Sequence, residues 1–301
     1  MNDQIQYQLI RLYCYVSDEY YSTLQGEMQR LSNHCSPKFS DEEVMATYLW
    51  GLIQGQRTVK AVYSFIKTYY LPFFPKLPGY AEYNRHLNLL LPAFRLLLEQ
   101  LLRKAEDLPF LEKDISIVDS FPIVVAQGKR SSRAKVAGEC CAKGYCASKD
   151  MHYYGLKLHS LNFRRENAIP VPETFQITAA NVHDLPAMKE VFRAQDNRLI
   201  FADKAYLDSE LKEELTQKNV WILTPHKKVK GEAEAVSQFL RAGRDLWSSA
   251  VSSVRQGIES FFNWLGEHFD LQHASKVRSS AGLYVFVLAR LSAAIWIFFY
   301  S

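Results

Sequence analysis

The sequence contains few cysteines, and their arrangement argues against a protein held together by disulfides. Five occur in 301 residues, at Cys14, Cys35, Cys140, Cys141 and Cys146. An odd number without regularly spaced pairs is typical of a protein from a reducing compartment. Cys140, Cys141 and Cys146 with His152 lack the two spaced ligand pairs of structural zinc sites. We therefore interpret them as ordinary thiols, with structural zinc as the alternative.

Neither sign of charge dominates the composition. Lys and Arg number 36 and Asp and Glu 32, which gives a net charge of +4. This excess is too small to indicate a nucleic-acid-binding protein by itself. Hydrophobic residues make up 48% and charged residues 23%, so a disordered or collagen-like chain is excluded. The positions of the basic residues are therefore more informative than their number.

Long apolar runs are also scarce, and residues 283–300 form the one that could cross a membrane. Arg290 lies near the middle of this run, where a charge costs about 2.5–3.5 kcal/mol on insertion. We therefore expect residues 281–301 to form an apolar helix packing on the core, with a membrane anchor as the alternative. The N-terminus lacks the pattern of a signal peptide, and we expect a cytoplasmic protein.

Several common enzyme motifs are missing. The chain has no G-x-S-x-G elbow and no G-x-G-x-x-G turn after a strand, which excludes typical serine hydrolases and dinucleotide-binding enzymes. Gly128-Lys129-Arg130 lacks both the earlier glycine and the hydroxyl residue of a phosphate-binding P-loop.

The first 105 residues have a helical pattern without strand-like alternation. Ser40-Asp41-Glu42-Glu43 has the spacing of a capping box before an apolar helix. Residues 84–104 form a Leu-rich helical segment, in which Pro92 either kinks the helix or begins a second one. We interpret residues 1–105 as a helical N-terminal domain.

From residue 114 the pattern changes to alternation. We predict strands at 114–120, 153–161, 173–179, 198–203 and 220–224, and helices at 185–194, 208–218 and 252–269. Three successive strands followed by alternating helices and strands fit an RNase H-like mixed sheet best among α/β topologies. We assign residues 106–280 to this domain.

Three acidic residues stand out in this second region. Asp119 and Asp203 each lie at the end of an apolar strand, and Glu259 lies beside the apolar side of a helix. Each alone is explained by a solvated acid or a local ion pair, such as Asp203 with Lys204 or Glu259 with Arg255. Together they form a carboxylate set suited to divalent cations such as Mg²⁺.

The order of the surrounding motifs resembles the DDE transposases of bacterial insertion sequences, most closely the insertion sequence 982 family. The matching segments are IVDSFPI at Asp119, YYGLKLHSL at Lys157 and His159, ITAANVHDLPAM at His183 and Asp184, LIFADKAY at Asp203, ILTPHKK, and Arg255-x-x-x-Glu259. Two positions depart from the family's helix signature: Ser252 replaces its Tyr and Gly266 its Lys.

The resemblance implies that Asp119, Asp203 and Glu259 are a catalytic triad holding two Mg²⁺ or Mn²⁺ ions. It also implies that the N-terminal helices of residues 1–105 bind the terminal inverted repeats and that the protein cleaves DNA and transfers strands to target double-stranded DNA. A homodimer or larger assembly on DNA in the nucleoid is implied as well. Arg255 and Lys157 would contact phosphates. His183 and Asp184 would have a positioning role, with Asp184 as a substitute ligand.

The basic residues cluster between residues 127 and 150. Lys129, Arg130, Arg133 and Lys135 are expected DNA-phosphate contacts, with a solvated hairpin loop as the alternative. Weaker candidates of the same kind are Arg241, Arg244, Lys276 and Arg278. Residues 58–68, with Arg57, Lys60 and Lys67, are a candidate recognition helix.

Two other functions fit the same residues. An RNase H-like nuclease would cut nucleic acid without strand transfer. A catalytically inactive relative would occupy DNA ends as a repressor.

Overall fold

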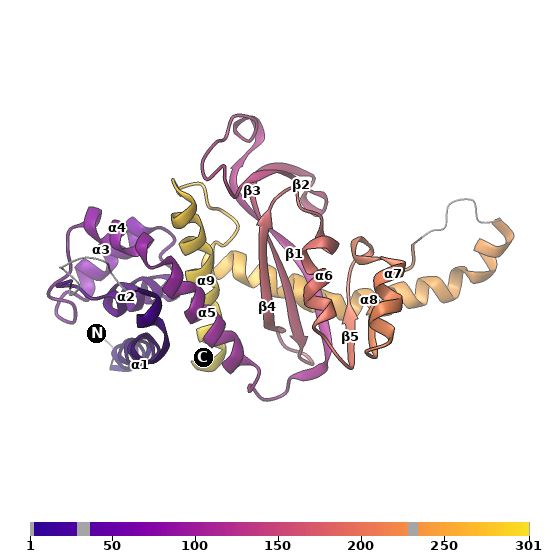
Figure 1. The fold of residues 1–301 in the computed structure, drawn as a ribbon, viewed down its shortest axis with the longest axis horizontal. Helices are drawn as coiled ribbons and strands as arrows, with labels where there is room; N and C mark the ends of the chain where they lie inside the picture. Colours follow the sequence, from indigo (N-terminus) through magenta and orange to yellow (C-terminus); the bar gives the residue numbers. More distant parts are fainter. Residues whose placement is uncertain (1–2, 29–36, 228–233, 301) are drawn as a thin grey trace. The chain divides into compact units, whose positions relative to one another are not determined.

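The computed structural model describes residues 3–28, 37–227 and 234–300, and it divides into two compact units (Figure 1). Unit 1 contains residues 1–105, 135–139 and 265–301, and unit 2 contains residues 106–134 and 140–264. The first segment of unit 1 ends at Ala105. The segments 135–139 and 265–280, which we had assigned to the second region, belong instead to unit 1.

Unit 1 is helical in its described part. Its helices are α1 (Asp3–Glu19), α2 (Asp41–Ile53), α3 (Val59–Tyr69), α4 (Tyr80–Leu89), α5 (Leu91–Ala105), α9 (Ser280–Tyr300) and the last residues of α8 (Glu234–Phe269). The capping box is present at α2, where the Ser40 hydroxyl accepts from the Glu43 amide and Glu43 accepts from the Ser40 amide. Pro92 is the second residue of α5, so it begins a second helix.

Helix α9 is long and apolar enough to meet the length and hydropathy criteria of a membrane span, yet about two thirds of it is buried within the structure. It packs against α2, α4 and α5. Arg290, near its middle, has no exposed surface. Its guanidinium donates to the carbonyls of Phe269 (2.8 Å), Phe286 (3.2 Å) and Arg57 (2.7 Å), and to the Tyr48 hydroxyl (3.4 Å). These partners explain how a charge is accommodated in an apolar helix.

Unit 2 is built on a six-stranded mixed sheet. The strands are β1 (Glu112–Gln127), β2 (Ala142–Cys146), β3 (Met151–Arg164), β4 (Val171–Ala179), β5 (Arg198–Phe201) and β6 (Val220–Leu223). Their order is β2-β3-β1-β5-β6, and β4 also pairs with β3. Strand β3 is antiparallel to β1, β2 and β4, whereas β5 is parallel to both β1 and β6.

Helices cover both faces of this sheet. On one face, Val118 of β1 and Ile200 of β5 join a buried cluster with α6 (Asp184–Arg193) and α7 (Ser209–Thr216). On the other face, Phe121 stacks on Phe262 of α8, with 5.1 Å between ring centroids. Because side chains alternate along a strand, the odd-numbered residues 117–121 of β1 face α8 and the even-numbered ones face α6 and α7.

Two elements differ from the sequence expectation. Residues 142–146, which we had included in a basic loop, form strand β2 and pair with residues 151–155 of β3. Helix α8 begins at Glu234, well before the expected start near Ser252. Its first part extends beyond the sheet of unit 2 (Figure 1).

Arg290 provides a test of how unit 1 is held together. We expect Arg290→Met to lower the free energy of unfolding by about 3 kcal/mol, because it leaves one buried and two partly buried carbonyls without their charged donor. The exposed Arg95→Met on α5 is the matched control and should cost less than about 0.5 kcal/mol. Urea unfolding followed by circular dichroism measures both. Equal effects of the two substitutions would show that the buried hydrogen bonds contribute little.

Candidate active site

The pairing of β1 with β5 brings Asp119 and Asp203 together. Ile117 of β1 lies opposite Phe201 of β5 in the parallel register. Asp119 and Asp203 each follow two residues later, so both lie at the same level and on the face that α8 covers. Asp203 comes just after β5, at the start of the short helix Lys204–Tyr206. Two carboxylates therefore meet on one face of the sheet, beside the carboxyl end of β5.

Arg255 of α8 contacts both of these carboxylates. Its Nη2 donates to Oδ2 of Asp119 at 3.1 Å, and its Nη1 lies 3.7 Å from Oδ1 of Asp203. The Arg255 side chain is 12% exposed, compared with 25% for Asp119 and 50% for Asp203. Arg255 is thus the most buried of the three side chains. Its Nε has no hydrogen-bond partner in the described part of the chain.

The environment of Asp119 disfavours its charged form. Burial raises the pKa of the Asp119 carboxyl to about 6, although Arg255 and the Ser120 amide, which donates to Oδ1 at 2.8 Å, both oppose the rise. The negative charges of Asp203 and Asp184 raise this pKa further. A perturbed carboxyl beside a second carboxylate is typical of catalytic and ion-binding sites.

Glu259 lies one turn after Arg255 on α8 and is exposed. Within the described ranges it has no hydrogen bond or ion pair, and no three His, Cys, Asp or Glu side chains gather closely enough to hold a metal ion. The structure therefore brings together Asp119, Asp203 and Arg255 but does not bring Glu259 into the same cluster.

Lys157 and His159 lie on the opposite face of the sheet from Asp119. They pair with Pro122 and Ser120 of β1, which are even-numbered positions. Lys157 Nζ donates to the Val182 carbonyl at 2.9 Å and contacts Asp184 at 3.2 Å. Lys157, expected as a phosphate contact, is thus engaged by an acid at the start of α6.

His159 is completely buried in the same cluster. Its Nε2 lies 2.9 Å from the Thr178 hydroxyl and its Nδ1 lies 3.5 Å from Asp184. Burial lowers the pKa of His159 to about 4, despite the opposing charge of Asp184. His183 precedes α6 as its N-cap residue and is exposed. The Lys157, His159 and Asp184 side chains form a cluster of their own.

Tyr206 is a buried neighbour that the sequence analysis did not single out. It is 1% exposed, and its hydroxyl has no hydrogen-bond partner in the described part of the chain. Burial raises its pKa, and the charges of Asp184, Asp119 and Asp203 raise it further. Tyr206 lies three residues after Asp203 in the LIFADKAY motif, and this position could have identified it as a neighbour of the site.

The expected basic residues are exposed. Lys129 and Arg130 form a short helix after β1, and Arg133 follows in unit 2, whereas Lys135 belongs to unit 1. Among the described residues, none of the four forms an ion pair with an acid. Their charges are therefore available to an anionic partner.

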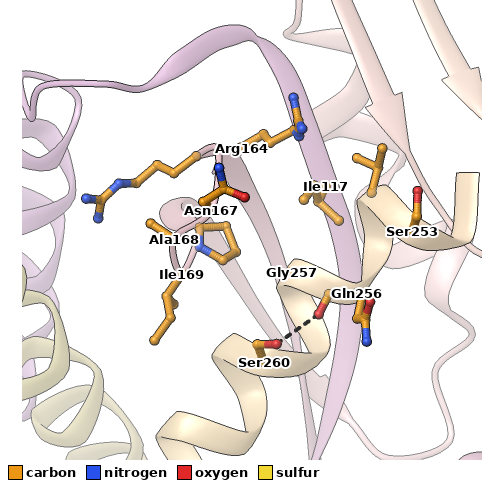
Figure 2. Close-up of a pocket in the computed structure, with 12 residues that line it drawn as sticks. Ile117, Arg164, Asn167, Ala168, Ile169, Ser253, Gln256, Gly257 and Ser260 are labelled. Carbon is orange, nitrogen blue, oxygen red and sulfur yellow. Dashed lines mark hydrogen bonds between the residues drawn. The ribbon is translucent and has the colours of Figure 1, made fainter. Parts of the chain in front are cut away.

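A cavity of about 480 Å³ lies on another side of α8 (Figure 2). Ile117 of β1, the β3–β4 turn and one side of α8 line it. Ser260 donates to the Gln256 carbonyl at its wall, at 3.2 Å. Its lining contains Arg164 and Arg165 and no carboxylate, so it adds no carboxylate ligand for a cation.

Comparison with known families identifies the second half of the chain. Residues 111–279 match the model of the transposase DDE domain, which is more than half of the 301 residues. The chain belongs to the DDE transposase family. The match spans β1 to the end of α8 and therefore includes Asp119, Asp203, Arg255 and Glu259. No curated protein and no solved structure matches the chain.

The ion pair of Arg255 in this transposase can be tested without any DNA. We expect Arg255→Gln to lower the free energy of unfolding by about 2 kcal/mol, because it leaves two neighbouring carboxylates without a cation. Mg²⁺ or Mn²⁺ should then raise Tm more in Arg255→Gln than in the wild type, since a bound cation replaces the lost charge.

Arg193→Gln is the matched control, because Arg193 forms surface ion pairs with Glu190 and Glu214 in the same unit. It should cost less stability than Arg255→Gln, because water screens exposed ion pairs, and it should leave the response to the cation unchanged. If Mg²⁺ raises the Tm of Arg255→Gln and of Arg193→Gln by the same amount, the result would contradict a cation site at Asp119 and Asp203.

Proposed function

We propose that this chain is the transposase of an insertion sequence resembling the 982 family. In this role it binds the terminal inverted repeats of its element, cleaves DNA at the ends and joins the 3′-ends to target DNA. The observation that carries the proposal is the convergence of Asp119 and Asp203 on Arg255 within a transposase DDE domain.

The strand arrangement supports an RNase H-like catalytic domain. Without β2, the strand order is β4-β3-β1-β5-β6, in which β3 is antiparallel to β1 and β5 is parallel to it. This arrangement places one acid on the central strand and one after its parallel neighbour. The extra strand β2 lengthens the hairpin between β1 and β3.

The chemistry of the two aspartates fits a divalent cation. Both are hard oxygen ligands, and both already face a positive group, the Arg255 guanidinium. Asp119 and Asp203 would hold Mg²⁺ or Mn²⁺, and Glu259, which has an exposed carboxylate on the same helix as Arg255, would complete the set. When bound, such ions activate the attacking oxygen and stabilise the departing one in phosphoryl transfer.

The reaction requires two successive displacements at phosphorus. Water first attacks the phosphodiester at an element end, forming a new P–O bond and releasing a 3′-hydroxyl. That hydroxyl then attacks a target phosphodiester and displaces a target 3′-oxygen, which takes up a proton. Arg255 and the exposed basic residues would position phosphates during both steps. No covalent enzyme intermediate is needed.

The three carboxylates can be tested separately. We expect Asp119→Asn, Asp203→Asn and Glu259→Gln each to reduce cleavage of end-containing DNA in Mg²⁺ by about a hundred-fold or more, with DNA binding retained. Glu213→Gln on α7, also an exposed acid, is the control and should retain full cleavage. Full cleavage by Glu259→Gln would remove this residue from the ligand set.

Strand transfer distinguishes the transposase from a nuclease or a repressor. Purified protein is incubated with precleaved end oligonucleotides and a supercoiled plasmid, and joined products are measured on a gel. Joined products support the transposase. Nicking alone would indicate a nuclease, and binding without cleavage would indicate a repressor.

The four basic residues after β1 should determine part of the salt dependence of DNA binding. Replacing Lys129, Arg130, Arg133 and Lys135 together by Ala should reduce the slope of log K against log salt by about three to four units, because each phosphate contact contributes about 0.9. Fluorescence anisotropy at several salt concentrations measures the slope. An unchanged slope would identify these residues as a solvated surface.

A further inference from the structure

Unit 1 contains a cavity of about 580 Å³, which we call the α3–α9 cavity. It is lined by the start of α3, by α4, by the segment between α8 and α9, and by the first turns of α9. All of these segments belong to unit 1. The volume lies within the range of ordinary ligand sites. It contains none of the residues of the candidate active site.

Positive charge dominates the lining of the α3–α9 cavity. Four exposed cations contribute to it: Arg57, Lys60, Lys276 and Arg278. The acid in the lining is Asp270, whose carboxylate is engaged by the His273 ring at 2.6 Å. Residues distant in the sequence, near 60 and near 277, thus bring like charges to one place. Such a concentration is unfavourable for the isolated protein unless an anion compensates it.

Carbonyls, rather than carboxylates, orient the two arginines. Arg57 Nη2 donates to the Glu267 carbonyl at 3.2 Å. Arg278 Nη1 donates to the carbonyls of Ser275 and Val277 at 3.1 and 2.9 Å. In the described part of unit 1, no acid pairs with either arginine, and Lys60 and Lys276 have no ion pair. The two arginines are thus held in place by carbonyls that leave their charge uncompensated.

The start of α3 adds to this field. The Thr58 hydroxyl accepts from the Ala61 amide at 3.1 Å and caps a helix of 11 residues. Val59 and Lys60 of its first turn line the cavity. The amino end of a helix carries a partial positive charge that favours phosphate, and here it acts together with the four cations.

We propose that the α3–α9 cavity binds the phosphodiester backbone of DNA and is the main DNA contact of unit 1. The inference rests on the proposed function, from which it takes DNA as the partner. Arg57 lies on the turn before α3, Lys60 in its first turn, and Lys276 and Arg278 on the segment between α8 and α9, so a strand crossing the cavity contacts both sides. Phosphate contacts of this kind do not depend on base sequence.

The test compares two triple variants of equal charge in the full-length protein. Lys60→Ala/Lys276→Ala/Arg278→Ala removes cavity cations and keeps Arg57, whose carbonyl accepts from Arg290. Lys38→Ala/Lys76→Ala/Arg95→Ala removes three exposed cations of unit 1 that do not line the cavity. The probe is a fluorescent DNA duplex of about 30 base pairs and arbitrary sequence, long enough for several phosphate contacts. Circular dichroism and Tm verify folding.

We expect the cavity triple to weaken binding by about ten-fold or more at physiological salt and to reduce the salt slope by two to three units, roughly 0.9 per lost contact. The control triple should change affinity by less than about three-fold. Equal effects of the two triples, or no binding by the wild type, would overturn the inference. DNA binding that depends on the cavity in a protein that neither cleaves nor joins DNA would overturn the proposed function alone.

Discussion

The ion pairs of Arg255 with Asp119 and Asp203 are the interaction on which the second unit depends. The parallel register of β1 and β5 places two carboxylates side by side on a partly buried face. Their mutual repulsion and the burial of Asp119 are unfavourable without a nearby cation. Helix α8 supplies that cation, and the stacking of Phe262 on Phe121 fixes the helix against the same strand two residues from Asp119. Packing and electrostatics therefore reinforce one another.

The sheet separates two charged clusters by the alternation of its side chains. Asp119 and Asp203 face α8, whereas Lys157 and His159 face α6 and contact Asp184. Each cluster combines acids with a cation, which is one reason why the net charge of the chain is small. Among the described residues, further exposed positive charges that no acid pairs with lie after β1 and around the α3–α9 cavity.

The sequence was most informative where local rules decide the structure. Alternation of apolar and polar residues predicted five strands, and the Ser40 capping box predicted the start of α2. For Pro92 the sequence left two alternatives, a kink or the start of a second helix, and the second describes α5. Strand β2 was not predicted because Ala142–Cys146 is short, contains Gly144 and forms through pairing with β3. The contact of Arg255 with Asp119 joins residues 136 positions apart, so spacing could suggest both residues but could not pair them. The assignment of Glu259 as a ligand stays a prediction.

Two well-buried arginines of this chain show why burial alone does not identify a functional charge. Arg290 is completely buried at the wall of the α3–α9 cavity, and its guanidinium is already engaged by carbonyls and a hydroxyl of its own unit. Arg255 faces carboxylates, one of which is half exposed. A cation can replace a guanidinium between carboxylates, but it cannot replace the directional N–H groups that satisfy carbonyls inside a helical core. The partners of an arginine, more than its depth, therefore distinguish a site open to exchange from one that holds the fold.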